Sequence, residues 1–273
     1  MPYLNGPSGI VWHYEEVGKG QTIIFLHGWG VSSQIWTQQL GFFSRTHRVL
    51  ALDLPGHGLS NRKKITFDSM VNDIDFFVKA KEEKSLHLVA SSFGGLIAIL
   101  IAFLPQVKSL TLVGALPKFL QSSDYPYGLA PERVAKLRAQ LVKDYPSIVQ
   151  IFFRSLFTSK ERQGEWFRWL ESFRAQQKVP QKRALERLLD MIEKEDRRKE
   201  FLQLQLPLLL VNGTEDAICP LPGAVYLKKQ KPHARLELFE DCGHFPFLSH
   251  PEKFNKLLED FLKEVKPSLS ARR

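Results

Sequence analysis

Cysteine is scarce in this chain of 273 residues, which has only Cys219 and Cys242. Two thiols are too few for a disulfide framework or for a zinc site built from cysteines. Long apolar runs are also missing, because glycine, serine or lysine interrupts each run before it reaches the length of a membrane span. The first residues have neither the basic nor the apolar segment of a signal peptide. We therefore expect a cytoplasmic protein that does not bind membranes.

Acidic residues are outnumbered, since 29 Asp and Glu stand against 38 Lys and Arg, giving a formal net charge of +9. Nucleic-acid binding would need a basic stripe with interleaved aromatics or a known module, and neither is visible, so we expect no nucleic-acid partner. Residues 120–200 alone have 17 Lys and Arg against 12 Asp and Glu. This excess is explained by a solvated helical surface, or by docking of an acidic protein through cations such as Arg138 and Arg154.

Strands and helices alternate over most of the chain. Short apolar runs bounded by turn-forming residues predict buried strands, and residues 67–79 have apolar side chains at helical spacing. An edge strand is predicted at residues 11–17. The alternation indicates a mostly parallel sheet with helices on both faces. The buried strands are predicted at residues 22–26, 48–53, 86–89, 109–114, 206–213 and 235–239, and a closing helix at 251–265.

The alternation stops between residues 119 and 197, where the sequence reads as helices broken by prolines and rich in aromatic residues. Such a segment is typical of an inserted helical lid, although many of its aromatics must also form a core. We therefore divide the chain into an α/β core of residues 1–118 and 198–273 and an inserted lid of residues 119–197. We expect the protein to be a monomer.

Ser92 lies where a short strand turns into an apolar helix. Ala90, Gly94 and Gly95 are the small neighbours that a sharp turn requires, and a serine on such a turn projects its hydroxyl into the open. The helix that follows offers its N-terminal amides to a developing oxyanion. This pattern is a nucleophile elbow in which alanine replaces the usual first glycine, and it predicts a catalytic Ser92.

A serine nucleophile needs a base and a group that orients the base. Both are predicted at strand ends, where parallel sheets build their sites: His244 as the base, and Asp216 as the orienting carboxylate. Glu215 is the close rival of Asp216, whereas Asp241 is interpreted as a loop or capping residue. The order Ser, Asp, His fits an α/β hydrolase.

The oxyanion should be bound by backbone amides of Trp29, in the glycine-rich loop after the first buried strand, and of Phe93, which follows the nucleophile. His27 opens that loop and is a second histidine that could be mistaken for the catalytic base. We expect it instead to brace the loop through hydrogen bonds.

Five motifs mark the chain: His27-Gly28-Trp29-Gly30 with Trp36, Asp53 to Ser60, Ser91 to Gly95, Gly213 to Asp216, and Gly243 to Pro251. Together they resemble the α/β-hydrolase superfamily. Within it, the chain is similar to the family of pimeloyl-acyl-carrier-protein methyl ester esterases of biotin synthesis. The resemblance implies a carboxylesterase that cleaves a methyl ester from an acyl chain on a small acidic carrier protein. It also implies an acyl pocket at Trp29, Ser92, Phe93 and, through a looser match of the lid, Phe152, Phe153 and Leu156.

The same triad also serves other reactions, so an enol-lactonase, a C–C bond hydrolase and a thioesterase remain alternatives. A non-catalytic receptor on a hydrolase fold is an alternative of a different class. The residues imply no metal and no organic cofactor.

Overall fold

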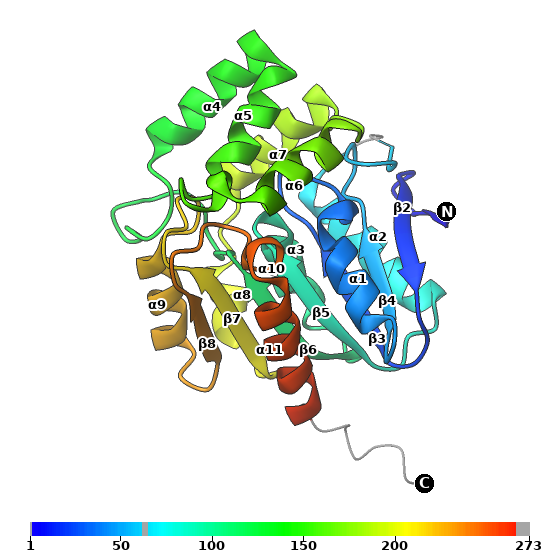
Figure 1. The fold of residues 1–273 in the computed structure, drawn as a ribbon. Helices are drawn as coiled ribbons and strands as arrows, with labels where there is room; N and C mark the ends of the chain where they lie inside the picture. The colour runs from blue at the N-terminus through cyan, green and yellow to red at the C-terminus, as the bar shows by residue number, and fades with distance from the viewer. Residues whose placement is uncertain (1, 62–64, 266–273) are drawn as a thin grey trace, which may run out of the picture.

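The computed structural model describes residues 2–61 and 65–265. Its strands are β1 Tyr3–Asn5, β2 Val11–Val17, β3 Thr22–Leu26, β4 Arg48–Leu52, β5 Leu86–Ser91, β6 Val107–Val113, β7 Leu208–Gly213 and β8 Arg235–Phe239. Across the described residues, these eight strands form one sheet in the order β1-β2-β4-β3-β5-β6-β7-β8 (Figure 1). Strand β2 runs antiparallel to β1 and β4, whereas the neighbours from β4 to β8 run parallel to one another.

The central strands are apolar along their whole length because helices cover the sheet on both faces. All five side chains of β3 are buried, as are all six of β5. In the register of the sheet, Leu26 lies opposite Ala90, and Ala90 lies opposite Leu112. The carboxyl ends of β3, β5 and β6 therefore meet at one edge, where loops build a site. The predicted mostly parallel sheet is confirmed.

Helices pack on the two faces in separate groups. On one face α1 contacts α11, and on the other α2 and α8 contact α3 (Figure 1). Helix α11 buries an apolar stripe and starts at a proline, as the spacing of its sequence predicted. The helices of the core are α1 Thr37–Phe43, α2 Phe67–Ala80, α3 Phe93–Ile101, α8 Arg198–Gln203, α9 Leu221–Gln230, α10 Pro246–Ser249 and α11 Pro251–Glu264, with the 3₁₀ helix η1 Ser33–Trp36.

A helical segment separates β6 from β7 in the sequence. It contains α4 Pro131–Asp144, α5 Ser147–Ser155, the 3₁₀ helix η2 Glu161–Gln163, α6 Glu165–Ala175 and α7 Lys182–Lys194. Figure 1 shows α4 to α7 gathered above one end of the sheet. In the described parts of the chain, none of the helices has both the length and the apolar character required to cross a bilayer.

The predicted edge strand is wrong in its position. Strand β2 is the second strand of the sheet, because Tyr3–Asn5 forms β1 on its outer side. Three residues are too few to show the alternation of a strand, so β1 could not be predicted from its residues.

Candidate active site

Ser92 joins β5 to α3 through an unusual backbone conformation, with φ 55° and ψ −126°. A residue other than glycine held at positive φ stores strain of about 1–3 kcal/mol. The turn is tightly packed: a Cβ on Gly94 would lie 2.6 Å from the His27 carbonyl oxygen, and one on Gly95 would lie 2.6 Å from the Ala115 Cβ. The small residues around Ser92 are therefore what permits this turn at the carboxyl edge of the sheet.

His244 and Asp216 form a buried hydrogen-bonded pair, in which Nδ1 of His244 lies 2.8 Å from Oδ2 of Asp216. The other carboxylate oxygen, Oδ1, accepts the N–H groups of Ile218 at 2.8 Å and Cys219 at 2.9 Å. We assign the imidazole proton to Nδ1, because a carboxylate can only accept it there. This assignment leaves Nε2 as a proton acceptor.

The rival carboxylates lie elsewhere. Glu215 is exposed, and the hydrogen bonds of the described residues include none from its carboxylate to His244. Asp241 is exposed and pairs with Lys160. Asp216 is thus the carboxylate in contact with His244, and Asp241 is a loop residue as interpreted from the sequence.

Gly114 connects the serine with this pair. The N–H of Ser92 donates to the carbonyl of Val113 at 3.0 Å, next to Gly114. A Cβ on Gly114 would lie 2.9 Å from Nδ1 of His244 and 3.0 Å from Oδ2 of Asp216. Its φ of 51° is also one that favours glycine. The end of β6 therefore lies against Ser92 and against the His244–Asp216 pair, which places all three in one neighbourhood.

The glycine-rich loop after β3 lies against the serine, since a Cβ on Gly28 would be 2.7 Å from the Cβ of Ser92. His27 braces this loop as expected: Nδ1–H donates to the carbonyl of Gly28 at 2.8 Å, and Nε2 accepts the N–H of Leu54 at 2.9 Å. Phe93 is the first residue of α3, so its N–H has no partner within the helix. The amides of Trp29 and Phe93 stay our predicted oxyanion donors.

A buried carboxylate, Asp53, holds the two loops behind the site together. Its oxygens accept the N–H groups of Ser33 at 2.7 Å and Leu59 at 3.0 Å, and Oδ2 lies 2.7 Å from Nδ1 of His13. Burial by itself would raise the pKa of Asp53, but the hydrogen bonds from His13 and the two amides keep that pKa below its ordinary value. Asp53 is therefore a structural anion of the loops.

His57 supports the glycine-rich loop from the same side. Its Nε2 accepts the N–H of Gly30 at 3.3 Å, and Nδ1–H donates to the carbonyl of Pro55 at 3.2 Å. Burial, with the neighbouring His27, lowers the pKa of His57 from 6.5 to about 3. His57 is thus neutral in the folded protein, and only the neutral ring can accept the N–H of Gly30.

We expect the buried histidine to make the fold acid-sensitive. Below pH 6.5 the unfolded chain protonates His57 while the folded chain does not, so the free energy of unfolding falls as the pH drops toward about 3. At 1.36 kcal/mol per pKa unit, the free energy of unfolding falls by about 5 kcal/mol between pH 6.5 and pH 3. Urea unfolding between pH 7 and pH 4 measures this slope. His57→Asn should flatten the slope, and the exposed control His233→Asn should not; equal slopes in all three proteins would contradict the assignment.

The helical segment is hydrogen-bonded to the loop that bears His244. The carbonyl of Leu156 accepts the N–H of His244 at 2.7 Å, and Oε2 of Glu161 accepts the N–H of Gly243 at 3.0 Å. Glu161 and Thr158 also exchange two hydrogen bonds in the pattern of a capping box, each side chain accepting the backbone N–H of the other residue. The Thr-x-x-Glu spacing of that box is a sequence signal for Glu161 that the search for catalytic residues missed.

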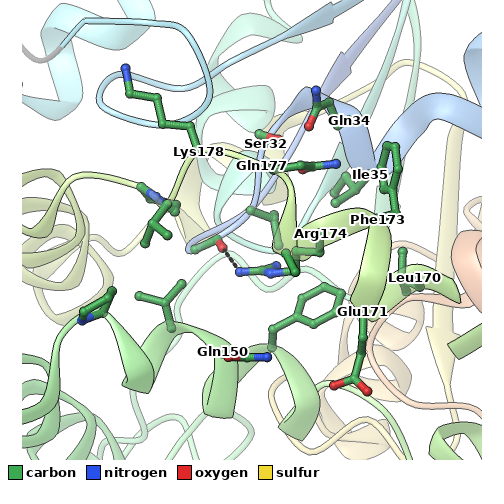
Figure 2. A pocket seen from close by; sticks show the side chains of 18 of the residues that line it. Ser32, Gln34, Ile35, Gln150, Leu170, Glu171, Phe173, Arg174, Gln177 and Lys178 are labelled. Atoms are coloured by element: carbon green, nitrogen blue, oxygen red, sulfur yellow. Dashed lines mark hydrogen bonds between the residues drawn. The ribbon is translucent and has the colours of Figure 1, made fainter. Parts of the chain in front are cut away.

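The predicted pocket residues have different surroundings. The ring of Phe152 meets the ring of Trp29 edge-on at 4.7 Å, and the indole N–H of Trp29 donates to the carbonyl of Leu185 at 2.9 Å. Phe153 lines a cavity of about 270 Å³ between η1, α5 and α6 (Figure 2). Ser92, Trp29, Phe152 and Leu156 are not part of its lining.

Two groups of side chains in the described residues bring potential metal ligands within 4.8 Å of one another: Asp216, Cys219 and His244, and Glu161, Cys242 and His250. Burial raises the pKa of both thiols, so they are protonated at neutral pH. A metal would have to displace those protons and the His244–Asp216 hydrogen bond. We assign neither group to a metal.

Comparison with known proteins adds the family to this geometry. A sequence model described as "alpha/beta hydrolase fold" matches residues 21–251. The chain belongs to the α/β-hydrolase fold family. A "Pimeloyl-[acyl-carrier protein] methyl ester esterase" of Nitrosomonas europaea is 30% identical over 247 residues, which cover 89% of this chain and 96% of the relative. One of Aeromonas salmonicida is 30% identical over 253 residues, covering 91% and 98%.

The family and these relatives establish a carboxylic ester hydrolase, as the resemblance implied. Solved structures agree with the fold. An esterase from Exiguobacterium antarcticum superposes with a TM-score of 0.85 at 25% identity and covers 96% of this chain and 99% of that one. A bromoperoxidase from Bacillus anthracis superposes with a TM-score of 0.87 at 22% identity, covering 96% and 100%, and this likeness concerns the fold alone.

Proposed function

We propose that this α/β hydrolase is a serine carboxylesterase that works through Ser92, His244 and Asp216. The observation that carries the proposal is the buried Nδ1–Oδ2 contact of 2.8 Å between His244 and Asp216, next to a serine in a strained turn. The neutral Nε2 of His244 takes the hydroxyl proton of Ser92 as the oxygen attacks the ester carbonyl. The amides of Trp29 and Phe93 stabilise the oxyanion.

Collapse of this tetrahedral intermediate releases the alcohol, which takes the proton from His244, and leaves an acyl-enzyme on Ser92. A water then attacks the acyl group, with His244 again as the base, and frees the acid. Asp216 stabilises the imidazolium formed in both halves. All of these steps use the chain's own side chains and amides.

The substrate we propose is the methyl ester of an acyl chain carried on acyl carrier protein, within biotin synthesis. The names of relatives that are about 30% identical over most of the chain support this assignment. We propose that residues 119–197 act as the lid over the ester, and that Trp29, Phe152, Phe153 and Leu156 contribute to acyl binding. The contact between Trp29 and Phe152 supports a lid that meets the glycine-rich loop.

A hydrolysis screen tests the proposal. Acyl methyl esters, free and carrier-bound, are compared with an enol-lactone and an acyl thioester, using Ser92→Ala as the control. Preference for the methyl esters supports the proposal, whereas preference for the lactone or the thioester assigns the site to those reactions. Failure of a serine-directed phosphonate to label the wild-type protein would favour the non-catalytic receptor.

The structure changes which cations we propose for docking an acidic carrier. Arg138 pairs with Asp190 at 3.0 Å and Glu193 at 2.9 Å, and Arg154 pairs with Glu171. These internal ion pairs occupy the two arginines that the sequence favoured, so their charge is largely compensated.

Lys136 and Lys143 are better candidates for docking. They are exposed, lie seven residues apart on one face of α4, and have no carboxylate within ion-pair distance among the described residues. We expect the double variant Lys136→Glu, Lys143→Glu to raise KM for a carrier-bound ester by roughly tenfold, because steering of an acidic partner is lost. Added salt should raise KM of the wild type likewise.

The matched control is Lys84→Glu, an exposed charge reversal just before β5, at the opposite end of that strand from Ser92. Lys84→Glu should leave KM for the carrier-bound ester unchanged. The double variant should leave KM for a small free ester unchanged. Equal effects on carrier-bound and free esters would leave a small-ester hydrolase that has no carrier docking site on α4.

A further inference from the structure

Arg174 occupies the wall of the 270 Å³ cavity in an unusual setting. It lies in the last turn of α6, and its guanidinium carbon is 3.9 Å from the centroid of the Phe153 ring. Its Nη2 donates to the carbonyl of Gly30 at 2.7 Å. Figure 2 shows the guanidinium in the middle of the lining, between Ser32 and Gln177 on one side and Gln150 and Glu171 on the other.

No carboxylate compensates this cation within the described residues. Glu171 lines the same cavity, but Arg154 holds its carboxylate in an ion pair. Burial lowers the pKa of Arg174 to about 10, with no acidic group to offset it, yet the side chain remains charged at neutral pH. A partly desolvated cation without a counter-ion favours an anion strongly.

The remaining lining suits a small amphipathic anion. Ser32, Gln34, Gln150 and Gln177 offer hydroxyl and amide donors. Lys178 borders the cavity with its ammonium directed away from Arg174 (Figure 2). Apolar side chains form the rest of the wall, namely Val31, Ile35, Val149, Leu170, Phe173 and Val179. A guanidinium has five N–H donors in a planar fork, so the bond to Gly30 leaves donors that a carboxylate or phosphate can accept.

We propose that Arg174 forms a second binding site, distinct from Ser92, for the carboxylate or phosphate group of a small ligand. Its link to catalysis rests on the proposed function: Gly30, which accepts the bond from Arg174, follows Trp29, whose amide is a proposed oxyanion donor. An anion here would therefore bind beside the ester site. The binding itself does not require esterase activity.

Calorimetric titration tests the site with two probes, inorganic phosphate and hexanoate, which distinguish a phosphate ligand from a carboxylate ligand. We expect at least one probe to bind the wild type and the Ser92→Ala variant equally. Arg174→Gln should weaken that binding at least tenfold, and Arg174→Lys should weaken it less. The control Arg168→Gln removes an exposed arginine of the same helix and should change nothing.

The proposal is overturned if neither probe binds, or if Arg174→Gln binds as tightly as the wild type. Circular dichroism shows whether Arg174→Gln folds. If it does not fold, Arg174→Lys decides the question: affinity equal to that of the wild type in the folded lysine variant overturns the proposal, because one ammonium cannot replace the planar donors of a guanidinium.

A kinetic comparison then asks what the site does for catalysis. Monomethyl adipate retains a free carboxylate, whereas dimethyl adipate has none. If the wild type hydrolyses both, Arg174→Gln should raise KM for the monomethyl ester alone, and an equal rise for both esters contradicts a role in anion binding. If the wild type hydrolyses neither ester, the proposed function fails for adipate esters. The titration still decides whether the anion site exists.

Discussion

Ser92→Ala is expected to lower kcat for ester hydrolysis by about 10⁶-fold while the fold stays intact. The substitution removes one oxygen atom, and alanine can occupy the same turn as the serine. His244→Ala should cause a loss of similar size, because the serine is a weak nucleophile without its base. The double variant should be scarcely slower than either single one, since the residues act as a unit.

Hydrolysis of a methyl ester by purified variants, with circular dichroism for the fold, measures these effects. The neighbouring Ser91 supplies a matched control, because its buried hydroxyl has no hydrogen-bond partner among the described residues. Ser91→Ala should keep nearly full activity. Turnover by Ser92→Ala at the wild-type rate would show that another residue is the nucleophile.

Asp216→Asn is expected to lower kcat by about 10⁴-fold. The reason lies in the two oxygens of the carboxylate. Because Oδ1 accepts the N–H groups of Ile218 and Cys219, the asparagine must keep its oxygen there and turn its NH₂ toward His244. Nδ1 of His244 then becomes an acceptor, the ring proton moves to Nε2, and the ring can no longer take the proton of Ser92.

The same kinetic assay checks this prediction, and the exposed Asp241→Asn is its control. A nitrogen-15 spectrum of the imidazole should show the proton on Nε2 in Asp216→Asn and on Nδ1 in the wild type. An active Asp216→Asn that has the proton on Nδ1 would contradict the assigned role.

The parallel core could be predicted because its signals are local and continuous. A short unbroken apolar run such as β3, bounded by turn-forming residues, is typical of a strand that is covered on both faces. Ser92 stood out because the period of the sequence changes at that residue, between small neighbours that the packing requires. Strand β1 had no such signal, since it gains its structure only by pairing with β2.

The contacts of the helical segment could not be predicted, because they join residues that are distant in sequence. The excess of positive charge was visible, but the pairing of Arg138 with Asp190 and of Arg154 with Glu171 depends on how the helices pack. Arg174 was one charged residue among many, and its significance depends on the position of Gly30, 144 residues earlier.

The bonds from Leu156 and Glu161 to the His244 loop limit how the enzyme can be re-engineered. Replacing all of residues 119–197 with a segment from another hydrolase, to obtain a new specificity, would also remove the supports of His244, the proposed base. A graft that exchanges residues 131–155 and 165–194 but keeps 156–164 should retain turnover of a small generic ester, whereas the complete exchange should lose it. The helices on either side can therefore be exchanged, whereas residues 156–164 cannot, and a library for directed evolution should hold residues 156–164 constant.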